Sequence, residues 1–155
     1  MFKIVAVKKA DQLETVRQLF QEYAEELEFE LDFQDFKEEL ARLPGEYASP
    51  DGALLLAIYH GQPVGCVAVR RIGDKSCEMK RLYVQPACRG RGIGKALAVS
   101  AINTAIRQGY RSMRLDTIDN MSEAIGLYNS LGFERIEPYR YNPIEGACFF
   151  ELKMK

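Results

Sequence analysis

The chain has 155 residues, 47% of them hydrophobic and 28% charged, and its formal net charge is −1. This apolar content excludes intrinsic disorder, and a membrane span is excluded because no run of about 18 consecutive apolar residues occurs. A chain of this length can bury one substantial core, so we expect a single domain over residues 1–155.

The first third of the chain predicts a strand followed by two helices. Residues 2–7 are apolar and partly β-branched, which favours a strand. Asp11 followed by Glu14 is typical of a helix start in which the aspartate caps the helix and the glutamate returns to the cap amide. Apolar residues then repeat at spacings of three and four, so we expect a helix over about 11–28 and a shorter one over about 33–42.

The middle of the chain predicts three strands. Residues 53–59 and 63–72 are apolar runs joined by a short His-Gly-Gln turn, which indicates a hairpin. A third run covers 77–84 and ends before Pro86, which cannot continue a hydrogen-bonded ladder. Alternate residues of this run are expected on opposite faces of the sheet, with Met79, Arg81 and Tyr83 on one face and Glu78, Lys80 and Leu82 on the other.

The last third predicts two more helices. A long helix is expected over about 93–108, because its apolar residues recur at helical spacing until a Gln-Gly pair. Asn120 with Glu123 offers a second capping box, for a helix that ends near Leu131. Three further strands are expected at 112–117, 133–137 and 147–153. The whole pattern indicates one mixed α/β domain.

The clearest chemical signal is the turn RGRGIGK, residues 89–95, between a strand and the long helix. Its three glycines allow backbone N–H groups to approach a ligand, and the helix N-terminus adds a partial positive charge. Three cationic side chains in the same turn favour a diphosphate over a merely tight connection. A Walker loop is excluded because Arg89 and Ala96 stand where it needs Gly and a hydroxyl, and a dinucleotide fingerprint is excluded by Lys95.

These residues resemble a known family. Arg89, Gly92 and Gly94 match the signature Arg/Gln-x-x-Gly-x-Gly/Ala, and LYNSLGF at residues 127–133 matches a second family motif. Over essentially its whole length the chain therefore resembles the GNAT superfamily of acetyl-CoA-dependent N-acetyltransferases. The resemblance implies the GNAT fold, which is a mixed, mostly antiparallel sheet of about six to seven strands with helices on both faces.

The resemblance also implies acetyl-CoA as cosubstrate, without a metal. The thioester would enter between two strands that part, here 77–84 and 112–117. Met121 stands where many relatives carry an asparagine that contacts CoA, and the adjacent Asn120 is the residue that could replace it. The implied cofactor-binding residues are Leu82, Tyr83 and Val84 for pantetheine, Arg89, Gly90, Arg91, Gly92, Ile93, Gly94 and Lys95 for the diphosphate, and Asn120.

Three residues are candidates for catalysis. Family likeness implies that Tyr128 protonates the departing thiolate, and the alternative is an aromatic residue that only packs on the apolar face of its helix. An ammonium with a pKa of about 10 must lose a proton before it attacks. Glu78 and Asp116 occupy positions at which relatives place this base, and Glu78 ranks slightly ahead. The alternative for each acid is a salt bridge with a neighbouring Lys or Arg.

The leading function is transfer of acetyl from acetyl-CoA to a primary amine of a small molecule or peptide, by direct attack in a ternary complex. The alternative is a CoA-binding regulatory module without turnover. A nucleic-acid partner is disfavoured by the net charge of −1. Residues 11–51 carry thirteen acids and three bases, whereas residues 70–114 carry eleven bases and two acids. This split indicates two oppositely charged ligands or two solvated faces.

The remaining sequence features concern location and assembly. Four cysteines without a CxxC pair and a single histidine argue against a structural zinc site and favour a reducing, cytoplasmic setting. The apolar start is six residues long and is followed by two lysines, which does not fit a signal peptide. We therefore expect no membrane partner. A homodimer is compatible with the sequence.

Overall fold

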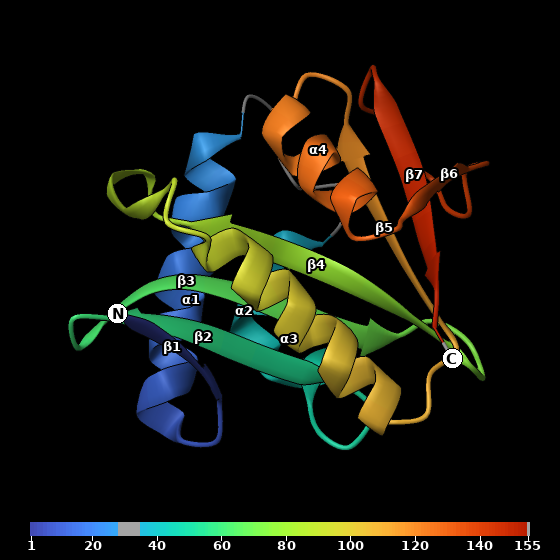
Figure 1. Ribbon diagram of the computed structural model, residues 1–155. Coiled ribbons are helices and arrows are strands. Elements are labelled where there is room, and N and C mark those ends of the chain that lie inside the picture. Colours follow the sequence, from blue (N-terminus) through green and yellow to red (C-terminus); the bar gives the residue numbers. More distant parts are fainter. Residues whose placement is uncertain (28–34, 155) are drawn as a thin grey trace.

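A seven-stranded sheet organises the computed structural model, which describes residues 1–27 and 35–154 (Figure 1). The strands are β1 (Phe2–Ala6), β2 (Ala53–Tyr59), β3 (Gln62–Arg71), β4 (Ser76–Val84), β5 (Ser112–Ile118), β6 (Glu134–Ile136) and β7 (Ala147–Lys153). Their order in the sheet is β1-β2-β3-β4-β5-β7-β6. Only the β4–β5 pair is parallel, so the mixed, mostly antiparallel sheet implied by the resemblance is confirmed.

Helices cover both faces of this sheet. They are α1 (Ala10–Glu26), α2 (Phe36–Arg42), α3 (Ile93–Arg107) and α4 (Ser122–Ser130), with short 3₁₀ turns η2 (Gly45–Tyr47) and η3 (Pro86–Cys88). Figure 1 shows α3 on one face and α1 on the other. Among the described residues, no helix has the length and apolar character that a bilayer crossing requires.

Two apolar clusters hold these layers together. Leu97 of α3 is fully buried against one face of the sheet, in a cluster that includes Val67 and Tyr128. On the opposite face, Val16 and Phe20 of α1 are fully buried in a second cluster. The helical spacing of apolar residues therefore predicted which helix faces the sheet buries.

The start of α1 differs from its prediction. The helix begins one residue before Asp11, so Lys9 is the N-cap and Gln12, rather than Glu14, occupies the third position. The side-chain oxygen of Gln12 accepts hydrogen bonds from the backbone nitrogens of Lys9 at 2.9 Å and Lys8 at 2.7 Å. Gln12 thus supplies the returning bond of a capping box that the sequence pattern assigns to Glu14.

The predicted capping box of α4 is wrong as well. The N-cap is Met121, and no side-chain hydrogen bond caps the helix. Asn120 precedes the cap and stays outside the helix, while Glu123 lies in its first turn. The expected start of the second helix near residue 33 lies outside the described residues, and the described part of that helix begins at Phe36.

A β-bulge in β4 breaks the alternation expected along this strand. Cys66 of β3 pairs with Tyr83 and Ala68 pairs with Lys80, so β4 has one more residue than β3 between these pairs. Arg81 lies in this bulge and has a φ of 60°. Met79 consequently packs in the cluster on the α3 side, whereas Tyr83 packs in the cluster on the α1 side. The prediction that these side chains share a face is therefore wrong.

The strands β4 and β5 part after only three residue pairs. Their pairing runs from Ser76↔Ser112 to Glu78↔Arg114, after which β5 continues beside β7 alone. Figure 1 shows the two strands diverging from the end at which they pair. This divergence is the parting of 77–84 and 112–117 that the resemblance implies.

Candidate active site

A groove runs from the free edge of β4 to the start of α3. Its volume is about 630 Å³, and α1 and α4 contribute to its walls. Nine of the expected cofactor-binding residues line it, namely Leu82, Tyr83, Val84, Arg89, Gly90, Gly92, Ile93, Gly94 and Asn120. Arg91 and Lys95 do not line it. The sequence motif therefore identified a continuous groove rather than an isolated turn.

The start of α3 provides the backbone donors of this groove. Gly92 is the N-cap with a φ of 82°, and Gly90 has the same φ. The first backbone bond of the helix joins the nitrogen of Ala96 to the oxygen of Gly92 at 3.0 Å, so the preceding N–H groups have no partner within the helix. A Cβ added at Gly90 or Gly92 would have no neighbour within 4 Å. The open space and the free donors fit a diphosphate.

The cationic side chains of the turn contribute less than the sequence predicts. Arg89 donates to the carbonyl oxygen of Val84 at 2.8 Å and to both carboxylate oxygens of Glu26 at 2.7 and 2.8 Å. Arg91 lies over the ring of Tyr59, with 5.2 Å between its guanidinium carbon and the ring centroid. Backbone amides are consequently the principal anion-binding groups, and Arg89 mainly joins α1 to the end of β4.

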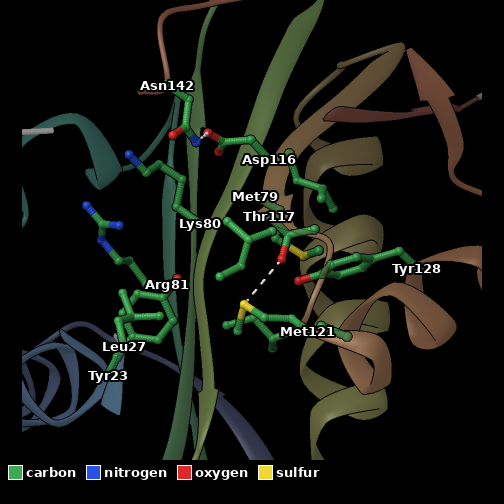
Figure 2. A pocket seen from close by; sticks show the side chains of 14 residues that line it. Tyr23, Leu27, Met79, Lys80, Arg81, Asp116, Thr117, Met121, Tyr128 and Asn142 are labelled. Atoms are coloured by element: carbon green, nitrogen blue, oxygen red, sulfur yellow. Dashed lines mark hydrogen bonds between the residues drawn. The ribbon is translucent and has the colours of Figure 1, made fainter. Parts of the chain in front are cut away.

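A second pocket, which we call the gap pocket, occupies the space between the diverging strands (Figure 2). Lys80 and Arg81 of β4 line one side, and Asp116 of β5 and Tyr128 of α4 line the other. The pocket shares six lining residues with the cofactor groove, namely Tyr23, Leu27, Leu82, Ile118, Met121 and Ala124. A ligand in the groove can therefore extend one end into the gap.

Tyr128 combines the two roles that the sequence left open. Its ring lies in the apolar cluster, with centroids 5.7 Å from Phe133 and 6.3 Å from Phe150. Its hydroxyl points into the gap pocket in Figure 2 and has no hydrogen-bond partner among the described residues. Burial raises the pKa of Tyr128, and the negative charges of Tyr23 and Asp116 would raise it further. The phenol therefore keeps its proton at neutral pH.

Asp116 is the candidate acid that lines the gap pocket. One carboxylate oxygen accepts a hydrogen bond from Arg140 at 2.7 Å, and the other accepts one from the side-chain amide of Asn142 at 2.9 Å. Both partners come from the loop that precedes β7. This loop fixes the orientation of the carboxylate at the wall of the pocket.

Glu78, the other candidate, is fully buried and does not line the gap pocket. One oxygen binds Arg70 at 2.9 Å, and the other accepts from the hydroxyl of Tyr139 and lies 3.2 Å from Arg140. Burial alone would raise the pKa of Glu78, but the charges of Lys80, Arg140 and Arg70 lower it overall. The salt bridge that the sequence left open is thus present, and Arg140 connects the two acids.

Lys80 is a site residue that the sequence pattern did not nominate. It lines the gap pocket and also a cavity of about 390 Å³ beside α2 and η2, which we call the α2 cavity. Burial first, then the charge of Arg81 and two other arginines, lower its pKa to about 7. The adjacent Arg81 was the only local signal, because Arg70 and Arg140 approach Lys80 only through the fold.

The groove and the gap pocket together define an acyl-CoA-dependent transferase, and sequence relatives agree with this class. Residues 13–133 match the model of the acetyltransferase (GNAT) family. An uncharacterised N-acetyltransferase of Schizosaccharomyces pombe is 42% identical over 153 residues, which cover 97% of this chain and 94% of that protein. The chain belongs to the GNAT acetyltransferase family and is an acyltransferase.

Solved structures show the same fold. A GNAT-family acetyltransferase of Staphylococcus aureus is 23% identical with a TM-score of 0.78, and the alignment covers 100% of both chains. A Salmonella typhimurium protein described as an acetyltransferase, solved with its cofactor acetyl-CoA, is 20% identical with a TM-score of 0.72 and covers 99% of this chain and 94% of its own.

Proposed function

We propose that the enzyme transfers the acetyl group of acetyl-CoA to a primary amine of a small molecule or peptide, by direct attack in a ternary complex. One observation carries the proposal. The gap pocket joins the cofactor groove and has Tyr128 on one wall and Asp116 on another. A thioester that extends from the groove into the gap would meet both groups, and an amine could reach it from the opposite side.

The residues of the groove would hold acetyl-CoA. The amides of Gly90 to Lys95 and the α3 N-terminus fit the diphosphate, and the unpaired edge of β4 at Leu82 to Val84 fits the amides of pantetheine. Asn120 lines the same groove, and its side-chain amide would bind CoA in place of an asparagine at position 121. When bound, acetyl-CoA supplies the electrophilic carbonyl carbon.

The two gap residues have separate roles in the proposal. Asp116 accepts a hydrogen bond from the acceptor nitrogen and orients it toward the carbonyl carbon. Tyr128 donates its proton as the C–S bond breaks, because burial keeps the phenol protonated. Glu78, which is nominated as a base by its position in the sequence, acts through its ion pairs with Arg70 and Arg140.

The proposal includes a reducing, cytoplasmic setting. All four cysteines are free thiols, and Cys66, Cys77 and Cys148 are buried. This arrangement supports a compartment in which disulfides do not form.

Release of CoA thiol from acetyl-CoA with a panel of amines, combined with the mass of the product, tests the proposal. Tyr128→Phe should lower kcat about 10- to 1000-fold and leave the Kd for acetyl-CoA nearly unchanged, because the hydroxyl acts as the thiolate forms. Tyr141→Phe is the matched control, since Tyr141 is 74% exposed. Tight acetyl-CoA binding without thiol release from any amine would instead support the regulatory module.

A further inference from the structure

We propose that Lys80 is the catalytic base, which removes a proton from the acceptor ammonium before the nitrogen attacks the thioester. The inference deepens the proposed function and rests on it, because it requires an amine acceptor in the gap pocket. It assigns the proton to a side chain of β4 in place of the two carboxylates, Asp116 and Glu78.

Lys80 occupies the junction of two cavities. It is the one described residue that lines both the gap pocket and the α2 cavity. It is only 8% exposed, and Figure 2 shows its side chain extending from β4 on the side of Arg81, away from Tyr128. An amine that passes from the α2 cavity into the gap therefore passes the Lys80 nitrogen, while the thioester lies toward Tyr128.

The charges around Lys80 favour its neutral form. The titratable groups that face it are Glu78 and Arg81 on β4, Arg70 on β3, Asp116 on β5, Arg140 in the loop before β7, and Glu39, Glu46 and Tyr47 across the α2 cavity. Burial opposes the ammonium form of Lys80, the three arginines oppose it further, and only Glu78 favours it appreciably. The resulting pKa of about 7 leaves a large fraction of neutral amine at neutral pH.

A neutral lysine suits this reaction better than the carboxylates. A base works best when its pKa lies near the working pH. Glu78 has a lowered pKa and no contact with the gap pocket. Both oxygens of Asp116 already accept hydrogen bonds from the loop, which favours an orienting role. The lysine gains a positive charge when it takes the proton, but the substrate loses one nearby, so the net charge of the buried site is unchanged.

The proton steps balance. The Lys80 nitrogen takes one proton from the ammonium, and the free amine forms a C–N bond to the thioester carbon. As the C–S bond breaks, the Tyr128 phenol protonates the thiolate, and the phenolate then takes the second proton that leaves the new amide nitrogen. Lys80 returns its proton to water. The products are the acetylated amine, the CoA thiol and one released proton.

Two variants of Lys80 test the assignment, with the fastest acceptor among aspartate, lysine, spermidine and a tripeptide. Lys80→Met removes the amine, and Lys80→Arg keeps the charge but cannot accept a proton. Both should lower kcat/KM at pH 7 on the order of 10²- to 10⁴-fold, with the Kd for acetyl-CoA nearly unchanged. Near pH 10, where much of the acceptor is already neutral in water, the loss should shrink to about tenfold or less.

The pH profile and a direct titration separate this inference from the proposed function. In the wild type the acidic limb of kcat/KM should fall near pH 7 and should move toward the pKa of the acceptor in both variants. Carbon NMR of the lysine side chains should show Lys80 titrating near pH 7. A titration above pH 9, an unmoved limb in Lys80→Met, or near wild-type activity of Lys80→Arg at pH 7 would overturn the inference while acetyl transfer stands. Absence of wild-type transfer to every amine would refute both.

Discussion

Arg140 connects the two buried acids of the site with a single guanidinium group. It lies 2.7 Å from Asp116 and 3.2 Å from Glu78, and Tyr139 beside it donates to Glu78. The arrangement links β4 and β5 just where their pairing ends, through a loop that belongs to neither strand. Arg140 therefore fixes the orientation of Asp116 and keeps Glu78 ionised.

Loss of this guanidinium should destabilise the protein. Arg140→Met leaves two buried carboxylates without a shared cation, and we expect a loss of about 3 kcal/mol in the free energy of unfolding. Urea denaturation measures it. Arg42→Met is the control, because the ion pair of Arg42 with Glu38 is 3.8 Å long and exposed, so its loss should cost less than about 0.5 kcal/mol.

The same variant should change how stability depends on pH. Because the folded pKa of Glu78 is lowered, its contribution is present above the unfolded pKa of about 4.3 and is lost as the pH falls through the folded value. Arg140→Met removes one of the charges that lower this pKa, so acid unfolding should begin at a higher pH than in the wild type. An identical acid midpoint in both proteins would contradict this role of Arg140.

At the residue scale, the sequence nominated Tyr128 and Asp116 from motif position, and both line the gap pocket. It could not separate Asp116 from Glu78, because the partners that distinguish them are Arg70, Tyr139 and Arg140, which are distant in sequence. Lys80 was missed for the same reason. A lysine in a polar strand is ordinary until the fold surrounds it with three arginines.

At the scale of elements, the start of α3 is the feature whose chemistry was most readable from sequence. Gly92→Asp would place a side chain and a negative charge where backbone amides face the groove, at a φ of 82°. We expect the Kd for acetyl-CoA to rise about 10- to 100-fold, as the loss of one or two charge-assisted hydrogen bonds implies. Calorimetry measures this Kd.

Gly61→Asp is the matched control for this change. Gly61 lies in the β2–β3 hairpin with a φ of 77°, and a Cβ added there would meet no atom within 4 Å, so the variant suffers the same backbone strain away from the groove. Its acetyl-CoA affinity should equal that of the wild type. Equal losses in the two variants would mean that general destabilisation, and not the anion site, accounts for the effect.

The strands and helices were predictable because their periodicity is local, whereas the bulge was not. Arg81 continues the alternation of its neighbours in sequence, and only the register with Cys66 and Ala68 shows the extra residue. The bulge brings Lys80 and Arg81 to the same side of β4, as Figure 2 shows. The polar side of the gap pocket thus depends on non-local strand pairing.

The uneven charge of the sequence has its explanation at the scale of the whole molecule. The acidic segment 11–51 and the basic segment 70–114 bind each other, instead of two ligands or bulk water. Four ion pairs join them, namely Glu26–Arg89, Glu39–Arg81, Glu46–Arg70 and Asp51–Arg71. The split in the sequence therefore reflects how α1, α2 and the following turn attach to the sheet.

Glu39 makes the most buried of these attachments. It binds Arg81 through both carboxylate oxygens, at 2.7 and 2.9 Å, and the Arg81 side chain is 2% exposed. Glu39→Gln should lower the free energy of unfolding by about 3 kcal/mol, because it removes the charge that compensates a buried guanidinium. Glu38→Gln, at a side chain that is 67% exposed, should change it by less than about 0.5 kcal/mol. Thermal and urea unfolding of both variants compare the two sites.

The short pairing of β4 with β5 makes the sheet resemble two blades joined at one end. Beyond Glu78 and Arg114 the facing backbone edges of these strands have no ladder between them. Acetyl-CoA seated along this seam would act as a missing rung, so cosubstrate binding and local rigidity should be thermodynamically linked. Amide hydrogen exchange in residues 79–84 should slow when acetyl-CoA is added, whereas β2 and β3 should be unaffected. The chain would then carry its loosest backbone at the place where its cosubstrate completes the sheet.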